Sequence, residues 1–475
     1  MLKGEVVTAM TETTPAESTA DLTEGGLDHG RGISRRHRWA DLAICLLILV
    51  ASLGFSAKHV SGHREISPFD EYVYIDYFAR VLDDGFVRQG DKTDDFARRY
   101  ISCHPNRAYG PWKPGLCPQH KPRPDRAYPF AGATTAGLYT PLFFLSTRLM
   151  AQPLVWAGVD LVQAGRYAAG MWLAIGGMLL FGALRRMRVR RPVALGATLM
   201  MVGSLAAYWG NTYLSTDATA LAAGAGMLFV VLGYLRRPSR STALAVVAVA
   251  AVASALKIQN LEAVVVGSGM LMMLAALEQV HAEGAALERV RQFLRDSRTR
   301  LGIVSMVVGV AVQVVWLVIR ALLSLGPDPD LGAGTPFHFP LDAVRDMLQF
   351  LPGVAGAGIY GPEVGDWSVI SVQILSLVIV GGVIGVGLGR RVTTEERSLG
   401  VSVLFAAVVA GPALSFATMV LNHVYVPLPT RYGASILPGM IACAAVLVPG
   451  RSRLVRFGFL AVGLVVYGIG LGLHQ

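Results

Sequence analysis

The segment WADLAICLLILVASLGFSA, residues 39–57, decides the fold class of this chain. It contains a single acidic residue, Asp41, and its length is close to the roughly 20 apolar residues that a helix needs to cross the hydrocarbon core of a bilayer. The sequence therefore predicts an all-α integral membrane protein with about eleven transmembrane helices. Ten further apolar stretches follow, at about 166–184, 193–210, 218–235, 242–256, 260–279, 301–324, 368–389, 399–421, 434–449 and 457–473.

The composition excludes an ordinary soluble globular protein. Hydrophobic residues make up 53% of the 475 residues and charged residues only 16%, whereas charged residues account for roughly 25% of a typical soluble domain. The formal net charge of +10 does not indicate a nucleic-acid partner, because the arginines lie in short clusters between apolar stretches. Clusters of this kind are topology signals. We expect membrane lipids and no nucleic acid among the partners.

The arginine clusters predict the orientation of the chain. They precede the first apolar stretch and then mark every second connection, at Arg35–Arg38, Arg185–Arg191, Arg236–Arg240, Arg289–Arg300, Arg390–Arg391 and Arg451–Arg456. Cytoplasmic loops of membrane proteins collect lysine and arginine. The pattern therefore predicts a multi-pass plasma-membrane protein with a cytoplasmic N-terminus and an external C-terminus.

The chain divides into a tail and one transmembrane domain. Residues 1–33 are polar and lack apolar periodicity, which is typical of a disordered segment, here a cytoplasmic tail. Residues 34–475 form the membrane domain, in which residues 58–165 are a long external loop. Within this loop, residues 136–158 are apolar, but counting them as a span would invert the charge alternation, so we expect an interfacial or re-entrant helix there. Residues 341–351 are expected to form another helix on the membrane surface.

An acidic pair, Asp70-Glu71, stands in the string ISPFDEYVYIDY, residues 66–77, just beyond the first apolar stretch. Carboxylates at the mouth of a membrane span are costly to desolvate and add nothing to a hydrophobic core, so they indicate chemistry. A carboxylate here could accept a proton from an attacking hydroxyl, and burial would raise its pKa. The alternative is structural, since acidic residues near a helix start, here with Pro68, offset the helix dipole.

Two cysteines, Cys103 and Cys117, share the polar part of the long loop. In an oxidising external space, a disulfide between them would contribute on the order of 3 kcal/mol. A zinc site with His104 and His120 is the alternative, but adjacent Cys-His ligands are geometrically awkward, so a disulfide is favoured. The acidic pair is not an Asp-x-Asp metal pattern. We therefore expect no metal and no cofactor, and a divalent cation is not indicated.

Six fragments resemble motifs of the GT-C superfamily of polytopic membrane glycosyltransferases, especially its protein O-mannosyltransferase and lipid A aminoarabinose transferase branches. Phe69-Asp70-Glu71 is similar to the acidic motif of their first external loop. The other fragments follow in the family's order: Leu138–Leu142, Ala164–Tyr167, Tyr213–Asp217, Ala255–Lys257 and Pro429–Gly433. The fragment at 138–142 lacks the histidine of the family's His-Pro-Pro-Leu-Tyr string, and Thr140 replaces its first proline.

This resemblance implies a reaction and a set of site residues. The donor would be a sugar linked through phosphate to a polyprenyl lipid, transferred with inversion to a glycan, lipid or protein acceptor at the external face. Asp70 would deprotonate the acceptor, with Glu71 as its alternative or orienting partner. The residues expected to bind the donor and its phosphate are Lys257, Arg431, Tyr432, Asp217 and Arg166.

Each of these residue types also has a structural explanation. Lysine and arginine at span ends often extend to the membrane interface, aspartate often caps a helix, and tyrosine often lies in the interfacial aromatic belt. Other functions compete as well. A secondary transporter would carry charges at mid-membrane and an inverted repeat. A polysaccharide polymerase or ligase would use external arginines without the acidic pair, and a non-catalytic scaffold would tolerate replacement of Asp70.

Overall fold

The computed structural model describes residues 27–63, 65–67, 70–104, 124–280, 285–329, 334–356, 366–389, 392–422, 425–426, 428–448 and 452–473. The chain forms two compact units, Met1–Ile44 and Cys45–Gln475, and helix α1, Leu27–Gly62, runs from the first into the second. Of the predicted tail, residues 27–33 are helical and residues 1–26 lie outside the described part. The following description concerns the second unit.

The described residues contain helices and two isolated β-bridges but no β-strand. Among them, eight helices are long and apolar enough to cross a membrane, which makes the chain an all-α, multi-pass membrane protein. These candidate spans are Arg38–Gly62, Leu161–Arg186, Thr216–Arg236, Ile258–Gln279, Ser297–Leu322, Asp366–Leu388, Thr394–Val420 and Arg453–Gly472.

The three remaining apolar stretches form shorter or bent helices. The stretch at 193–210 is a pair, α6 (Arg191–Val202) and α7 (Leu205–Thr212), bent by 54° where the side chain of Ser204 caps α7. The stretch at 242–256 is α9, Arg240–Leu256, whose 17 residues rise about 26 Å, less than the roughly 30 Å hydrocarbon core. The stretch at 434–449 contains α17, Leu437–Val446.

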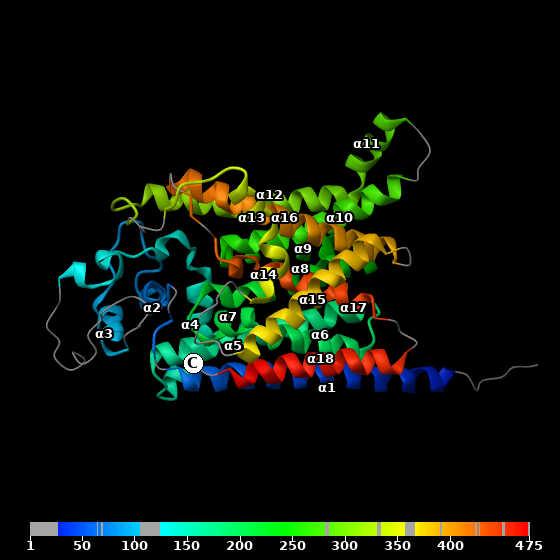
Figure 1. The fold of residues 1–475 in the computed structure, drawn as a ribbon, viewed down its shortest axis with the longest axis horizontal. Helices are drawn as coiled ribbons and strands as arrows, with labels where there is room; N and C mark the ends of the chain where they lie inside the picture. Colours follow the sequence, from blue (N-terminus) through cyan, green and yellow to red (C-terminus); the bar gives the residue numbers. More distant parts are fainter. Residues whose placement is uncertain are drawn as a thin grey trace, which may run out of the picture. The chain divides into compact units, whose positions relative to one another are not determined.

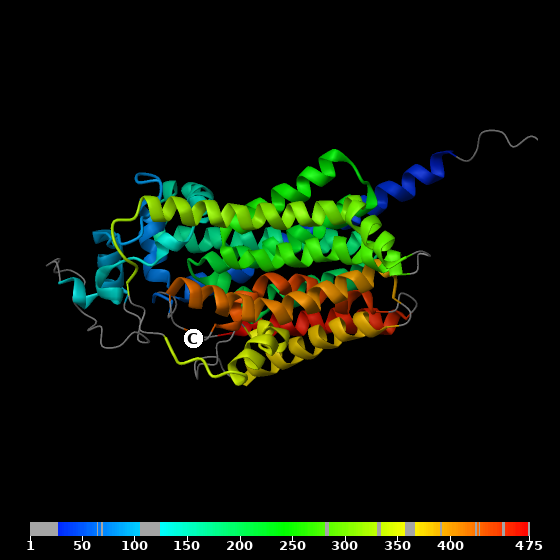
Figure 2. The same cartoon turned by 90° about the horizontal axis from the view of Figure 1, so that it is seen from above.

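The long helices run roughly parallel between two ends of the second unit (Figures 1 and 2). One end carries α2 (Glu71–Arg80) and α3 (Asp95–Cys103), and is called the α2 end below. The opposite end carries α11 (Ala286–Arg295), and is called the α11 end.

The other elements used below are α4 (Pro141–Trp156), α5 (Leu161–Arg186), α8 (Ala220–Arg236), α10 (Leu261–Val280), α12 (Ser297–Leu322), α13 (Leu341–Leu348), α14 (Phe350–Gly353), α15 (Asp366–Leu388), α16 (Thr394–Asn422) and α18 (Arg453–Gly472). Three short 3-10 helices are also relevant below: η5 (Thr216–Thr219), η6 (Ile258–Asn260) and η8 (Thr430–Ile436).

The span that contains η5 and α8 is the most buried, with 78% of its apolar window inside the protein against 17% for α18. Small residues allow this close packing. A Cβ atom on Gly176 of α5 would lie 3.0 Å from the backbone nitrogen of Ala222, and one on Gly224 would lie 2.1 Å from the carbonyl oxygen of Ser435. Glycines at such crossings let helix backbones approach closely. The packing therefore fixes η5 and η8 beside one another at the α2 end.

The loop helices at the α2 end have an aromatic core. The rings of Tyr77 in α2 and Phe144 in α4 stack with centroids 4.0 Å apart, and both side chains are buried. Helix α4 occupies the apolar stretch at 136–158 and is not among the helices long and apolar enough to span a membrane. This core connects α2, whose first residue follows Asp70, to the spanning helices.

Candidate functional site

Asp70 adopts a strained backbone conformation before α2. Its φ of 31° and ψ of −5° lie in the left-handed region, which costs a non-glycine residue on the order of 1–3 kcal/mol. Its carbonyl oxygen accepts the first helical hydrogen bonds, but its side chain makes no capping bond. Instead, the carboxylate lies 3.3 Å from Nη2 of Arg431 and is 32% exposed. The side chain of Asp70 therefore pairs with Arg431 and does not cap α2.

Arg431 connects two carboxylates that are distant in sequence. It is the second residue of η8, and its side chain is only 10% exposed. Its guanidinium contacts Oδ2 of Asp70 through Nη2 and lies 3.6 Å from Oδ2 of Asp217 through Nε. Asp217 belongs to η5, where the hydroxyl of Ser215 also donates to its carboxylate at 3.2 Å.

Lys257 completes the group from the end of α9. It follows the last residue of that helix in an extended conformation, and its ammonium group donates to Oδ1 of Asp217. Its side chain is almost fully buried. Asp70, Asp217, Lys257 and Arg431 are called the charged quartet below. Two cations and two carboxylates balance formally. Asp217 contacts both cations, whereas among the described residues Asp70 forms an ion pair with Arg431 alone, at 3.3 Å.

Tyrosines flank the charged quartet. The ring centroid of Tyr432 lies 5.0 Å from Nζ of Lys257 and 5.4 Å from Cζ of Arg431, within the range of cation–π attraction. The hydroxyl of Tyr74 donates to that of Tyr139 at 3.1 Å, and both tyrosines interact electrostatically with Asp70. Such aromatic faces and hydroxyls can stack on and hydrogen-bond to a sugar ring.

The environment tunes the protonation of the quartet's loop residues. Burial raises the pKa of Asp70, as does the neighbouring Asp217, against the opposing effects of Arg431 and Lys257. Burial acts against the charge on Arg431, but Asp217, Tyr432 and Asp70 outweigh it and raise the pKa of this guanidinium. Burial also raises the pKa of Tyr432. The site therefore combines a carboxylate of increased basicity with a permanently charged arginine.

Glu71 is bound differently from its neighbour Asp70. Its buried carboxylate forms a bidentate ion pair with Arg166 of α5, with both N–O distances at 2.8 Å. It also accepts the backbone N–H groups of Ser67 at 2.7 Å and Leu214 at 2.8 Å. Four donors occupy this carboxylate, so it has little capacity left for a substrate.

Arg166 is equally occupied. Besides Glu71, it donates to the carbonyl oxygens of His63 and Glu65, each at 2.8 Å, and none of its side chain is exposed. The pair thus joins the segment before Asp70 to α5 and to the segment before Asp217. These contacts favour the orienting role that the resemblance allowed for Glu71. We propose the same positioning role for Arg166, which the resemblance placed among the donor-binding residues.

The predicted cysteine pair is only partly within the described residues. Cys103 ends α3 and is disulfide-bonded, whereas Cys443 is a buried free thiol. Cys117 and His120 lie outside the described part, so the predicted pairing with Cys117 stays a prediction. Within the described ranges, no group of three or more His, Cys, Asp or Glu side chains is arranged to hold a metal ion.

Three further residues near the quartet were missed by the sequence analysis. Tyr74 and Tyr139 lie in the string 66–77 and in the fragment 138–142, whose aromatic content was the available signal. Glu262, in the first turn of α10, is buried and lies 3.5 Å from the hydroxyl of Ser435. Its signal was an acidic residue at the start of an apolar stretch, a placement that is rare and often functional.

No protein-family model and no curated protein matches this sequence.

Proposed function

We propose that this chain is a membrane glycosyltransferase that moves a sugar from a polyprenyl-phosphate donor to an acceptor hydroxyl, with inversion, at the external face of the plasma membrane. The observation that carries the proposal is the charged quartet, which gathers Asp70, Asp217, Lys257 and Arg431 from four separate segments. The resemblance of these same segments to GT-C motifs supports the reaction class. The acceptor is a glycan, a lipid or a protein.

Asp70 is the general base in this proposal. Of the two carboxylates in the quartet, that of Asp70 is the more exposed. Its ion pair with Arg431 is long, and burial raises its pKa. As the acceptor oxygen bonds to the anomeric carbon, the bond from that carbon to the phosphate oxygen breaks. The acceptor proton passes to Asp70, and the lipid phosphate leaves with the bonding electron pair.

Lys257 and Arg431 stabilise the negative charge that develops on the leaving phosphate. Guanidinium binds phosphate oxygens through paired N–H donors, while the ammonium acts as a point charge. Asp217 contacts both cations and therefore holds them in place before the donor arrives. Preorganised charges of this kind need no rearrangement when the reaction occurs. No cofactor enters these steps.

The proposed topology has eleven spans, a cytoplasmic N-terminus and an external C-terminus. The eight candidate spans are then completed by the bent pair α6–α7, by α9 and by the stretch at 434–449 that contains α17. In support, α9 and α17 each pack against other spans in the second unit and place Lys257 and Arg431 at the α2 end. The α2 end would then be external and the α11 end cytoplasmic.

A secondary transporter is the second candidate, because of Glu262. Its carboxyl is buried at the start of an apolar span, and Oε1 has no hydrogen-bond partner among the described residues. Buried ionisable groups in spans are often part of ion or proton pathways. A transporter would leave its substrate chemically unchanged, which separates the two candidates.

The test is a donor panel. Purified protein in lipid nanodiscs is incubated with polyprenyl-phosphate sugars that differ in the sugar, and loss of each donor is followed by mass spectrometry. The proposal expects consumption of at least one donor, with release of the free polyprenyl phosphate. No consumption of any donor, together with proton-dependent uptake of a solute into proteoliposomes, would support the transporter instead.

A further inference from the structure

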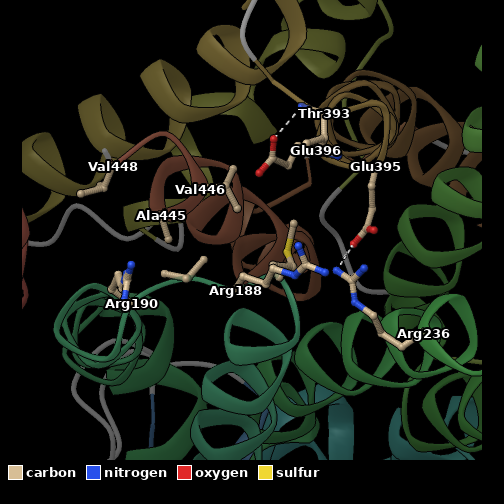
Figure 3. Close-up of a pocket in the computed structure, with 11 residues that line it drawn as sticks. Arg188, Arg190, Arg236, Thr393, Glu395, Glu396, Ala445, Val446 and Val448 are labelled. Atoms are coloured by element: carbon tan, nitrogen blue, oxygen red, sulfur yellow. Dashed lines mark hydrogen bonds and ion pairs between the residues drawn. The ribbon is translucent and has the colours of Figure 1, made fainter. Parts of the chain in front are cut away.

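A pocket of about 470 Å³ opens at the α11 end, at the opposite end of the helices from the charged quartet. The end of α5, the start of α6, the end of α8, the start of α16 and the end of α17 form its walls. Figure 3 shows Arg188 and Arg236 extending toward one another in this pocket, and Arg190 also lines it. Three arginines from two connections thus share one hollow.

The acidic groups of the pocket are already engaged. Glu395 forms a 2.9 Å ion pair with Arg236. Glu396 accepts the backbone N–H of Thr393 at 2.7 Å and thereby caps the start of α16 (Figure 3). Arg188 and Arg190 are exposed and have no carboxylate partner among the described residues. The pocket's three arginines and two glutamates therefore leave a formal net charge of +1, with Arg188 and Arg190 unpaired among the described residues. The N-terminus of α6 beside them also favours an anion.

Arg188 occupies a position that normally selects glycine. Its φ is 63°, and its N–H bonds the carbonyl of Arg185 at 3.1 Å while the N–H of Val189 bonds that of Leu184 at 3.0 Å. This is the Schellman pattern of a helix end, whose left-handed residue is usually glycine because other residues are strained there. In this left-handed conformation, Arg188 lines the pocket with its guanidinium. Residues held in rare backbone conformations often occur at binding sites.

We propose that this pocket binds a phosphate group, carried either by an anionic lipid or by a soluble compound. Guanidinium groups are well suited to phosphate oxygens. Met187, Val189, Ala445 and Val446 form an apolar wall beside the arginines, which suits an amphiphilic molecule such as an anionic phospholipid. The site lies apart from the quartet and does not depend on the proposed transfer reaction.

Two probes distinguish the sources of the phosphate. Full-length protein in a neutral, non-ionic detergent is titrated with phosphatidylglycerol and, separately, with inorganic pyrophosphate, and binding is measured by native mass spectrometry and calorimetry. Binding of phosphatidylglycerol alone would identify a lipid site, and binding of pyrophosphate would identify a site for soluble phosphates. Either result supports the proposal, whereas binding of neither probe overturns it.

The variants Arg188→Gly and Arg190→Gln test the assignment to this pocket. Arg188→Gly relieves the left-handed strain, so loss of binding in it cannot be explained by a poorer fold. We expect each variant to weaken binding at least ten-fold. Arg240→Gln, an exposed arginine at the same end but outside the pocket, should bind as the unmodified protein does. Equal binding by Arg188→Gly, or equal loss in Arg240→Gln, would overturn the proposal and leave the arginines as topology signals.

Discussion

Replacing Arg166 by methionine should destabilise the protein without a specific loss of donor binding. The change removes a 0% exposed guanidinium and its bidentate pair with Glu71, leaving a buried carboxylate with only two backbone donors. Breaking a buried ion pair by removing one partner costs about 3–5 kcal/mol. Since folded proteins are stable by only about 5–15 kcal/mol, this is a large fraction of the total.

The assay is thermal unfolding in detergent, combined with a two-variant cycle. Glu71→Gln alone should lower the unfolding temperature. In the Arg166→Met background, however, Glu71→Gln should raise it, because no uncompensated charge remains. The amide oxygen still accepts one of the two backbone N–H groups, which bond different oxygens of Glu71. Arg236→Met is the matched control, since its pair with Glu395 is 37% and 21% exposed and should contribute about 1 kcal/mol or less.

One result would refute this reasoning. If Arg166→Met unfolds at the same temperature as the unmodified protein but binds a polyprenyl-phosphate sugar much more weakly, then Arg166 is a donor ligand, as the resemblance implied. A positioning role predicts the reverse: a lower unfolding temperature, with donor affinity retained below that temperature.

Three further predictions concern other described residues. Arg431→Ala should raise the dissociation constant for the donor about ten- to hundred-fold, because a charge-assisted hydrogen bond to the phosphate is lost. An unchanged dissociation constant in a binding titration would show that Arg431 does not bind the donor phosphate. Burial raises the pKa of Asp76 to about 6, so ionisation of this carboxyl destabilises the fold, and the free energy of unfolding falls as pH rises from about 4 to 6. The Asp76→Asn variant, measured by denaturation over this range, should lose less stability than the unmodified protein. An identical pH profile for the two proteins would contradict the raised pKa. Cys103→Ser, which removes the disulfide, should lower the unfolding temperature of non-reduced protein, while a reducing agent should lower that of the unmodified protein and leave the variant unaffected.

The hydrophobic pattern could predict the long spanning helices, but not where an apolar stretch would bend or divide into two helices. Apolar runs such as 39–57 and 301–324 became long helices because their length alone satisfies the bilayer. The bend before α7 depends on the side chain of Ser204 and on a change of backbone direction after Gly203, which a hydropathy average does not detect. The helix starting at Glu71 was expected, but the left-handed backbone of Asp70 was not.

The site residues could be listed from the sequence, but not their partners. Asp70, Asp217, Lys257 and Arg431 were selected by charge and by order along the chain, and the structure brings them together. The sequence could not predict that the adjacent carboxylates of Asp70 and Glu71 would bind different partners. Glu71 pairs with a residue 95 positions away, a contact set by helix packing and not by local sequence.

The most direct test of the central claim is the rate of sugar transfer by Asp70→Asn. With a donor identified in the panel, transfer by the purified variant is compared with its donor affinity and with Asp84→Asn, a more exposed aspartate at the α2 end. The account predicts that Asp70→Asn binds donor and folds normally but transfers at least a hundred-fold more slowly, since general-base catalysis contributes about 10²–10⁴-fold. Transfer by Asp70→Asn at the rate of the unmodified protein would contradict it.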